Sequence, residues 1–336
     1  MKKETVVITG ATGFIGGFLV EEAFKRDMNI FCVVRKSSDL SRISLPGVRF
    51  LYFHPEDAIQ LDAEMAQFSI EYGCPDYFIH NAGITKSVRT SDFDRVNAQH
   101  TARFAAGVAR HFSSLKRFVL MSSLAAQGPG NDQNLKPITI SDYPIPNTLY
   151  GKSKLTAEKL LKQFTNIPWV ILRPTGVYGP REHDYYLYLK SLTRGIEPVM
   201  GFKEQHLSFL YVTDLVQAVF LSLTEPVVGE TFLLSDGNNY TGTEYGDIAR
   251  EALNCKAIRV RIPLQVVRLI SSLLEYTGRI TKNTPTLNND KFLSIKALNW
   301  TVDINETQMR LKYHPQVDLR TGLRLCVEWY RKNKWL

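Results

Sequence analysis

The sequence predicts an α/β fold in which helices cover both faces of a parallel sheet. Short apolar runs rich in Val, Ile and Phe, bounded by Gly, Pro, Ser or Asn, are typical of strands. Between them lie stretches with apolar residues at three- and four-residue spacing, which are typical of helices. The alternation predicts right-handed crossovers, and the nearly continuous apolar runs predict strands buried on both faces. The predicted strands are residues 5–9, 30–34, 48–53, 76–79, 117–121 and 169–172.

The second half of the chain has a different pattern. Gly and Pro punctuate residues 173–180 and 195–201. Residues 265–276 form an apolar-striped helix. We expect it to pack on the surface, and a helix that skims a membrane or covers the substrate is the alternative. The other elements predicted here are strands 209–212 and 231–234 and helices that end at 223 or lie near 243–253 and 319–330.

Composition limits the classes of function that are open to this protein. The 336 residues allow two or three lobes, and 44% hydrophobic with 22% charged residues is ordinary for a globular protein. The net charge of +8 suits an anionic ligand, but the positive charges are scattered, so we expect no nucleic-acid partner. The seven histidines show no metal-ligand spacing, and we expect no metal site.

The same composition favours a cytoplasmic protein. The four cysteines stand alone, without a C-x-x-C pair, which favours a reducing compartment. Four glycines interrupt the first apolar stretch, which is unlike a signal peptide. The chain has no apolar run of about 18 residues, so we expect no membrane span.

A glycine-rich segment follows the first predicted strand and opens the first predicted helix. Its glycines allow a tight turn and a close approach of the backbone to a pyrophosphate, and the N-terminus of the helix presents free N–H groups to that anion. The position between strand and helix therefore predicts a dinucleotide site. The residues expected to form it are Gly10, Thr12, Gly13, Phe14, Ile15 and Gly16.

The end of the second predicted strand bears on the choice of cofactor. A site selective for NAD usually places Asp or Glu there, on the ribose 2′-hydroxyl. Here Arg35 and Lys36 follow the strand, and no carboxylate occurs before Asp39. Because a guanidinium can bind a phosphate through two hydrogen bonds, NADP(H) is favoured, with NAD(H) as the alternative.

A tyrosine and a lysine four residues apart predict proton-transfer chemistry. Tyr150 and Lys154 share one face of a predicted helix. We expect the ammonium to lower the pKa of the phenol from about 10, so that it can exchange a proton with a substrate oxygen. Two other pairs have this spacing, but only this one follows a strand that ends in serines, Ser122 and Ser123. Ligands of α/β proteins bind at that edge of the sheet.

Five motifs together resemble the extended short-chain dehydrogenase/reductase family, which includes NAD-dependent epimerases and dehydratases. They are T-G-A-T-G-F-I-G at 9–16, H-N-A-G at 80–83, S-S-L-A-A-Q-G at 122–128, Y-G-K-S-K at 150–154 and R-P-T-G-V-Y-G-P at 173–180. The resemblance implies a Rossmann-type, doubly wound parallel sheet with a smaller C-terminal substrate lobe. The implied nucleotide-binding domain is 1–175 plus about 205–235, the substrate lobe is 176–204 and about 236–315, and the C-terminal helix lies in 316–336.

The resemblance also implies a catalytic site. Tyr150 would be the general acid or base, Lys154 would tune it and hold the nicotinamide ribose, and Ser123 would hydrogen-bond the substrate oxygen. Ser122 is the structural neighbour with which Ser123 could be confused. Asn97 is open to a structural role or a water relay. The other implied cofactor contacts are Asn81, Ala82, Gly83, Pro174 and Val177.

Departures from the subfamilies narrow the expected reaction. Leu124 and Ala125 stand where 4,6-dehydratases of the family carry an Asp-Glu pair, and Leu207 stands where epimerases tend to place an arginine on the diphosphate. Arg35 and two later segments are similar to the dihydroflavonol reductase and 3β-hydroxysteroid dehydrogenase branch. We therefore expect an NAD(P)(H)-dependent oxidoreductase that transfers hydride between nicotinamide and a small-molecule carbonyl or secondary alcohol.

Two alternatives stay open, and the substrate stays unnamed. One alternative is a nucleotide-sugar epimerase with tightly bound NAD. The other is a non-catalytic NADP-sensing protein, against which the intact Ser-Tyr-Lys set argues. The helices near 91–112 and 150–164 form the usual dimer face of the family, which implies a homodimer. Four residues are expected to wall the substrate pocket, with a structural role equally open for three of them: Lys86, Tyr178, Arg181 and Tyr186.

Overall fold

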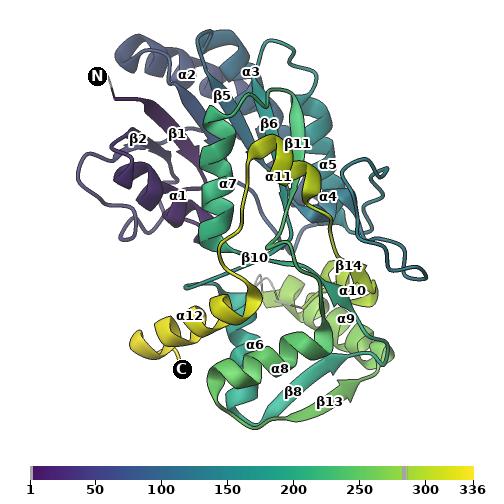
Figure 1. The fold of residues 1–336 in the computed structure, drawn as a ribbon. Helices are drawn as coiled ribbons and strands as arrows, with labels where there is room; N and C mark the ends of the chain where they lie inside the picture. Colours follow the sequence, from purple (N-terminus) through teal and green to yellow (C-terminus); the bar gives the residue numbers. More distant parts are fainter. Residues whose placement is uncertain (1–2, 282–284, 286) are drawn as a thin grey trace.

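A seven-stranded sheet organises the larger lobe of the computed structural model, which describes residues 3–281, 285 and 287–336. All neighbouring strands run parallel (Figure 1). The order across the sheet is β11 (Glu230–Leu234), β6 (Trp169–Pro174), β5 (Arg117–Met121), β4 (Tyr77–His80), β1 (Thr5–Thr9), β2 (Asn29–Val33) and β3 (Arg49–Leu51). Strand order reverses between β1 and β4, which is the doubly wound, Rossmann-type topology that the sequence predicts.

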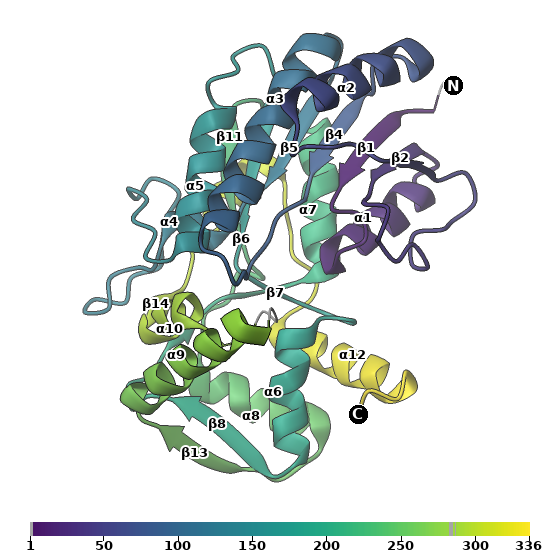
Figure 2. The same ribbon diagram turned by 180° about the vertical axis from the view of Figure 1, so that it is seen from behind.

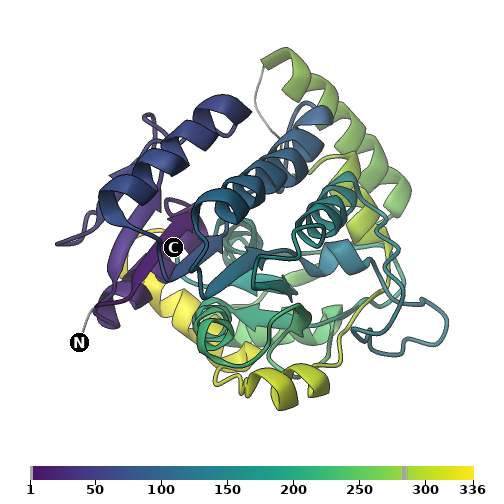
Figure 3. The same cartoon turned by 90° about the horizontal axis from the view of Figure 1, so that it is seen from above.

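Helices cover the sheet on both faces, as Figure 3 shows from above. Successive strand residues point to opposite faces, so Val7, Phe31 and Phe78 enter one core while Val6 and Ile8 enter the other. One layer consists of α2 (Ala58–Tyr72), α3 (His100–His111) and α5 (Leu149–Leu161). The opposite layer consists of α1 (Phe14–Lys25), α7 (Val212–Thr224) and α11 (Asn305–Leu311).

The smaller lobe lies below the carboxyl ends of the strands (Figures 1 and 2). An aromatic core that contains Tyr178, Tyr245 and Tyr330 holds together α6 (His183–Thr193), α8 (Gly242–Leu253) and α12 (Leu319–Lys332). The lobe also contains α9 (Leu264–Thr281) and α10 (Asn289–Lys296). Its small sheets contain β8 (Ile196–Met200) with β13 (Ile258–Ile262), β7 (Gly176–Tyr178) with β10 (Phe209–Tyr211), and β9 (His206–Leu207) with β12 (Tyr240–Thr241) and β14 (Asn299–Trp300).

The predicted strands of the large sheet are all present, and their ends lie within two residues of the prediction. The predicted helix 265–276 is longer and extends from 264 to 281. Strands β7 and β8 were not predicted, because Gly and Pro dominate their surroundings and their partners are distant in sequence. Two short elements complete the frame of the site: a π-helix, η1 (Phe93–Gln99), and α4 (Leu124–Gln127).

Candidate active site

The glycine loop between β1 and α1 leaves no space for a Cβ at two of its positions, Gly10 and Gly16. Gly10 has φ of +67°, and a Cβ there would lie 2.8 Å from Cα of Ala82. A Cβ on Gly16 would collide with the carbonyl oxygen of Gly10. Gly13 caps α1 without a side chain, so no side chain occupies the free N–H groups of the first turn. The loop therefore fits the pyrophosphate of a dinucleotide.

His80 holds the end of β4 in the neutral state. Its Nδ1 is 3.0 Å from Oγ1 of Thr9, and its Nε2 is 3.0 Å from Oγ1 of Thr101. Burial lowers the pKa of His80 to about 3, helped by the nearby charge of Lys154. Both ring nitrogens are engaged with threonines, which makes His80 a structural residue.

Asn97, on η1, fixes the loop that follows β4. Its Oδ1 accepts a hydrogen bond from the backbone N–H of Ile84 at 2.8 Å, and its Nδ2 donates to the carbonyl of Ile84 at 3.0 Å and to Oγ of Ser153 at 2.9 Å. Gly83 lies in this loop, and a Cβ there would come 3.0 Å from Oδ1 of Asn97 and 3.1 Å from Nζ of Lys154. Asn97 thus ties the loop to α5, which assigns it a structural role.

The two serines after β5 differ in their partners. Ser122 is buried, and its Oγ donates to Oε1 of Glu158 at 2.5 Å. Arg173 binds both oxygens of the same carboxylate, at 2.9 and 2.5 Å, and also donates to Gln127. Ser123 instead caps α4, where its Oγ accepts the N–H of Ala125 at 3.1 Å. Ser122 therefore belongs to a buried structural network.

Ser123 is the serine that meets the tyrosine. Its side chain is half-buried and lies close enough to the phenol of Tyr150 to affect its pKa. Burial raises the pKa of Tyr150, and the neighbouring hydroxyl of Ser123 opposes that shift. The pKa of Tyr150 is therefore raised, whereas we expected Lys154 to lower it, and Lys154 is not among the causes of the shift.

The position of Lys154 explains that difference. Its Nζ donates to the carbonyl of Met121 at 2.7 Å, at the end of β5, and lies beside Gly83. Burial lowers the pKa of Lys154 to about 8, and the charge of Glu158 opposes the shift. The amine of Lys154 thus lies between the ends of β4 and β5. Burial is the main cause of the raised pKa of Tyr150.

The first turn of α5 is held from both sides. Oγ1 of Thr148 accepts the N–H of Gly151 at 2.9 Å, as a helix cap does. Asp290, from α10 in the smaller lobe, accepts the N–H of Leu149 at 2.5 Å and that of Tyr150 at 3.2 Å. Sequence reasoning missed Asp290 because 140 residues separate it from Tyr150 and no motif connects them.

The residues expected around the cofactor surround this edge. Arg35 and Lys36 follow β2 and are exposed, and among the described residues neither side chain forms an ion pair. Asn81 donates to the carbonyl of Gly10 at 3.3 Å, and the N–H of Ala82 donates to Thr9 at 3.1 Å. Pro174 ends β6 and Val177 lies half-buried in β7.

Two of the four expected substrate residues lie in the core of the smaller lobe. Tyr178 is 1% exposed and donates to the carbonyl of Asp318 at 3.2 Å. Tyr186 is buried and donates to the carbonyl of Trp335 at 2.6 Å. The expectation that they wall a substrate pocket is wrong for this state, because aromatic packing and backbone carbonyls occupy both rings and both hydroxyls.

The other two connect parts of the molecule. Arg181 pairs with Glu21 of α1 at 2.7 Å and lies over the ring of Phe18. Nζ of Lys86, in the loop after β4, is 3.4 Å from the carboxylate of Asp184 on α6. Both pairs cross from the large lobe to the segment that follows β7.

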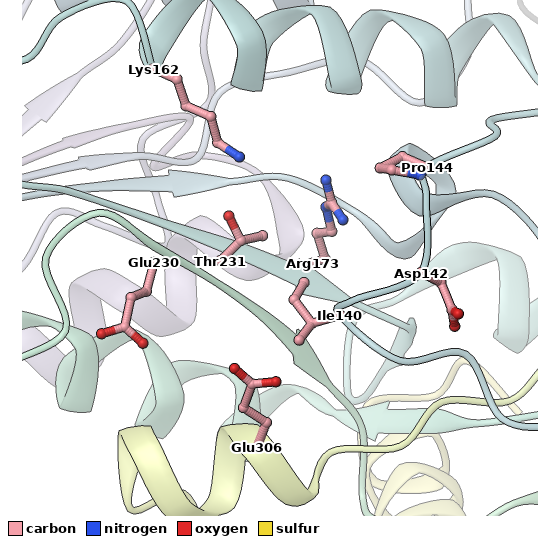
Figure 4. A pocket seen from close by; sticks show the side chains of 8 residues that line it. All are labelled: Ile140, Asp142, Pro144, Lys162, Arg173, Glu230, Thr231 and Glu306. Carbon is pink, nitrogen blue, oxygen red and sulfur yellow. The ribbon is translucent and has the colours of Figure 1, made fainter.

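A hollow of about 320 Å³ lies elsewhere (Figure 4). Glu230 begins β11 and Lys162 follows α5, so this hollow reaches the end of the sheet opposite the glycine loop. It does not include the serine, tyrosine and lysine described above. Its lining is Ile140, Asp142, Pro144, Lys162, Arg173, Glu230, Thr231 and Glu306.

Two further findings concern metal binding and membrane-spanning helices. Within the described part of the chain, no group of three His, Cys, Asp or Glu is placed to hold a metal ion. None of the described helices is long and apolar enough to cross a membrane.

Known proteins resemble this chain over nearly its full length. A ceramide reductase of Caulobacter vibrioides is 26% identical, covering 98% of this chain and 96% of that protein. An uncharacterized UDP-glucose epimerase, YtcB, of Bacillus subtilis is 28% identical, covering 95% of each. The crystal structure of a UDP-glucose 4-epimerase of Thermotoga maritima, with UDP-glucose, has a TM-score of 0.77 at 21% identity and covers 98% of this chain and 99% of that one.

The family model for the NAD-dependent epimerase/dehydratase family matches residues 6–234. This range contains the glycine loop, Ser123, Tyr150 and Lys154, and it ends with the last strand of the large sheet. The chain is therefore an enzyme of the extended short-chain dehydrogenase/reductase type and belongs to the NAD-dependent epimerase/dehydratase family.

Proposed function

We propose that this enzyme is an NADP(H)-dependent oxidoreductase acting on a carbonyl or secondary alcohol. The observation that carries the proposal is that Ser123 lies beside Tyr150 at the carboxyl edge of the sheet, with Lys154 one helical turn further along and the glycine loop on the same edge. Nicotinamide, when bound, supplies or accepts the hydride.

The side chains divide the proton chemistry. Because burial raises its pKa, Tyr150 holds its proton at neutral pH and can donate it to the oxygen of a carbonyl as that oxygen gains charge. Ser123 can donate a second hydrogen bond to the same oxygen. Lys154, whose Nζ lies next to Gly83, would hold a ribose hydroxyl. This protonation state favours the reductive direction.

The proposed cofactor is NADP(H), and Arg35 and Lys36 support it. Both are exposed at the end of β2, and the described acidic residues leave both cations unpaired. A 2′-phosphate would supply the missing counter-charge, and Arg35 could hold it through two hydrogen bonds.

Two observations favour a substrate that is not a nucleotide sugar. Leu207, on β9, offers no charge to a diphosphate, and Arg181 is already paired with Glu21. Leu124 and Ala125 begin α4 directly after Ser123, so no acid pair follows the serine. The similarity to a ceramide reductase agrees with an apolar substrate.

Replacing Tyr150 with Phe tests the proposed role. Oxidation of NADPH is followed with a panel of sterols, flavonoids, long-chain ketones and nucleotide sugars. The variant should lose turnover of any compound that the wild type reduces, while its affinity for NADPH stays within a few-fold. Turnover equal to that of the wild type would contradict the role of Tyr150.

A nucleotide-sugar epimerase with tightly held NAD is the second candidate. The similarity to UDP-glucose epimerases, over 95% of the chain for the Bacillus subtilis protein, favours it. It predicts NAD that copurifies with the protein and no net change in nicotinamide absorbance during turnover, whereas the oxidoreductase consumes its cofactor stoichiometrically.

We also propose a cytoplasmic homodimer that pairs through α3, α5 and η1. A shallow hollow of about 130 Å³ between η1 and α5, lined by Phe93, Leu149 and Thr156 among others, supports that face. Sedimentation velocity of the wild type tests the dimer.

A further inference from the structure

Helix α9 turns its large apolar side chains away from the protein. Leu269, Leu273 and Tyr276 are 70%, 60% and 65% exposed. They recur at three- and four-residue spacing and therefore share one face of the helix. Figure 2 shows α9 on the outside of the smaller lobe. The exposed apolar residues of α9 are Val266, Leu269, Ile270, Leu273, Leu274 and Tyr276, which we call the α9 face.

The side of α9 that faces the protein is narrow. Among the α9 side chains that the structure describes, the buried residues are Val267, Ser271 and Gly278, two of which are small and contribute little apolar area. A helix stabilised only by packing on its own lobe would bury its leucines. A contiguous exposed patch of this kind marks an interaction site.

The apolar surface continues beyond the helix. Leu264, the first residue of α9, packs against Gly201, and the next residue, Phe202, is 68% exposed. Arg261 donates to the backbone carbonyl of Phe202 at 3.1 Å, which joins the two segments. An exposed aromatic residue at the start of α9 and Tyr276 further along it are amphipathic anchors of the kind found at membrane interfaces.

Positive charge is concentrated in the same part of the chain. Residues 254–298 contain eight Lys and Arg against two acidic residues, Glu275 and Asp290. The segment therefore carries +6 in sequence, of which Arg259 is paired with Glu197 and Lys291 with Asp184 outside it. Arg268, on α9, is exposed and forms no ion pair with the described residues, and the same holds for Lys296 on α10.

We propose that the α9 face docks on an anionic lipid bilayer, with its leucines in the interface and the surrounding cations on the headgroups. An apolar helix face together with cations is the combination that binds such a surface, and each cation near it adds to the attraction. A protein partner would need both a matching shape and acidic groups opposite these cations. An anionic bilayer supplies negative charge without any specific geometry.

The position of the helix connects this surface to the active site. Asn289, at the start of α10, contacts α9 through Ser272 and Glu275, and the next residue, Asp290, caps the helix that carries Tyr150. A bilayer under α9 would therefore lie beside the lobe that covers the active site. Docking itself is independent of the proposed reaction, whereas delivery of an apolar substrate from the bilayer rests on the proposed function.

Flotation with lipid vesicles tests the proposal. The full-length protein is mixed with vesicles of phosphatidylcholine alone or of phosphatidylcholine with phosphatidylglycerol. The wild type should partition at least about tenfold more strongly into the anionic vesicles, and high salt should weaken binding. The double variant Leu269→Glu/Leu273→Glu should lose this binding.

A matched control carries the same charge change elsewhere. Ile59 and Ile70, on α2, are 85% and 79% exposed, so Ile59→Glu/Ile70→Glu should float as the wild type does. Affinity for NADPH shows that each variant is folded. If Leu269→Glu/Leu273→Glu no longer binds NADPH, the Leu269→Trp variant described below decides the question. Failure of the wild type to float, or equal loss in the control, would overturn the proposal.

A second measurement separates a bilayer from a second copy of the chain. Leu269→Trp should give a fluorescence that brominated lipid quenches, because the indole enters the interface. If the indole is not quenched, and Leu269→Glu/Leu273→Glu instead converts dimers to monomers in sedimentation velocity, the α9 face is a dimer interface and the proposal is wrong. An inactive enzyme that still floats would contradict only the proposed function.

Discussion

Burial shifts the pKa values of three side chains at the edge of the sheet. It raises the pKa of Tyr150, lowers that of Lys154 to about 8 and lowers that of His80 to about 3. In each case the low-dielectric surroundings favour the uncharged form. The sequence places the tyrosine and lysine one turn apart, but it does not reveal that the amine reaches the carbonyl of Met121.

His80 makes stability depend on pH. Its pKa is depressed on folding, so between about 6.5 and about 3 the unfolded chain binds a proton that the folded protein does not. Each unit of pH decrease in that window should therefore remove up to about 1.4 kcal/mol of unfolding free energy. Denaturant unfolding at pH 7 and pH 5 should show a larger loss for the wild type than for His80→Gln. An identical loss would contradict this assignment.

Arg35 should discriminate between the two nicotinamide cofactors. Arg35→Ala removes the proposed partner of the 2′-phosphate and should weaken NADP binding about tenfold or more, while NAD binding stays the same. Titration calorimetry with both cofactors measures this. Arg194→Ala, an exposed arginine of the smaller lobe, is the control. Equal weakening for NADP and NAD would show that Arg35 does not recognise the phosphate.

Among the helices and strands, α5 matters most for the proposed reaction, because it carries Tyr150 and Lys154. Its first turn is capped by Thr148 and by Asp290 of α10, and its middle is tied to β5 and β6 through Glu158. These contacts fix the height and the rotation of Tyr150 over the end of the sheet.

Removing the acceptor on α10 should affect both stability and catalysis. Asp290→Ala leaves the N–H groups of Leu149 and Tyr150 without their carboxylate and should lower the unfolding free energy by about 0.5–2 kcal/mol. It should also reduce kcat, since the first turn bears Tyr150. Asp318→Ala, which removes the cap of α12, should lower stability alone. A similar effect of both variants on kcat would refute this coupling.

The buried pair of Glu158 and Arg173 should be costly to break. Glu158→Ala leaves a guanidinium that is 4% exposed without its carboxylate, which typically costs about 3–5 kcal/mol. Glu251→Ala removes an exposed partner of Arg320 and should have no measurable effect. Chemical denaturation of the two variants compares them, and similar midpoints would contradict the structural role of this pair.

At the scale of the whole molecule, local patterns predicted the large sheet and not the smaller lobe. Strands such as Thr5–Thr9 and Arg117–Met121 contain a continuous apolar run and alternate with helical stretches, so local patterns suffice to predict them. β7 and β8 depend on partners 33 and 62 residues away, at Phe209 and Ile258. Such pairings are decided by tertiary contacts.

For the candidate site too, local motifs predicted some residues and missed those that depend on tertiary contacts. The glycine loop and the Ser123–Tyr150–Lys154 set follow from motifs on adjacent strands and helices. Asp290 could not be predicted, because only the docking of α10 brings it to α5. Tyr178 was misassigned because a tyrosine after a strand end suits a pocket wall and a core equally, and its hydroxyl contacts a carbonyl of the distant Asp318.

The most direct test of the account is deuterium transfer from NADPH labelled at C4 of the nicotinamide, with a substrate found in the panel. We expect a product that carries deuterium on the carbon of a new secondary alcohol, with one NADPH oxidised per product. The Tyr150→Phe variant should give no such product. Label that returns to the cofactor with no net oxidation, or undiminished transfer in Tyr150→Phe, would contradict it.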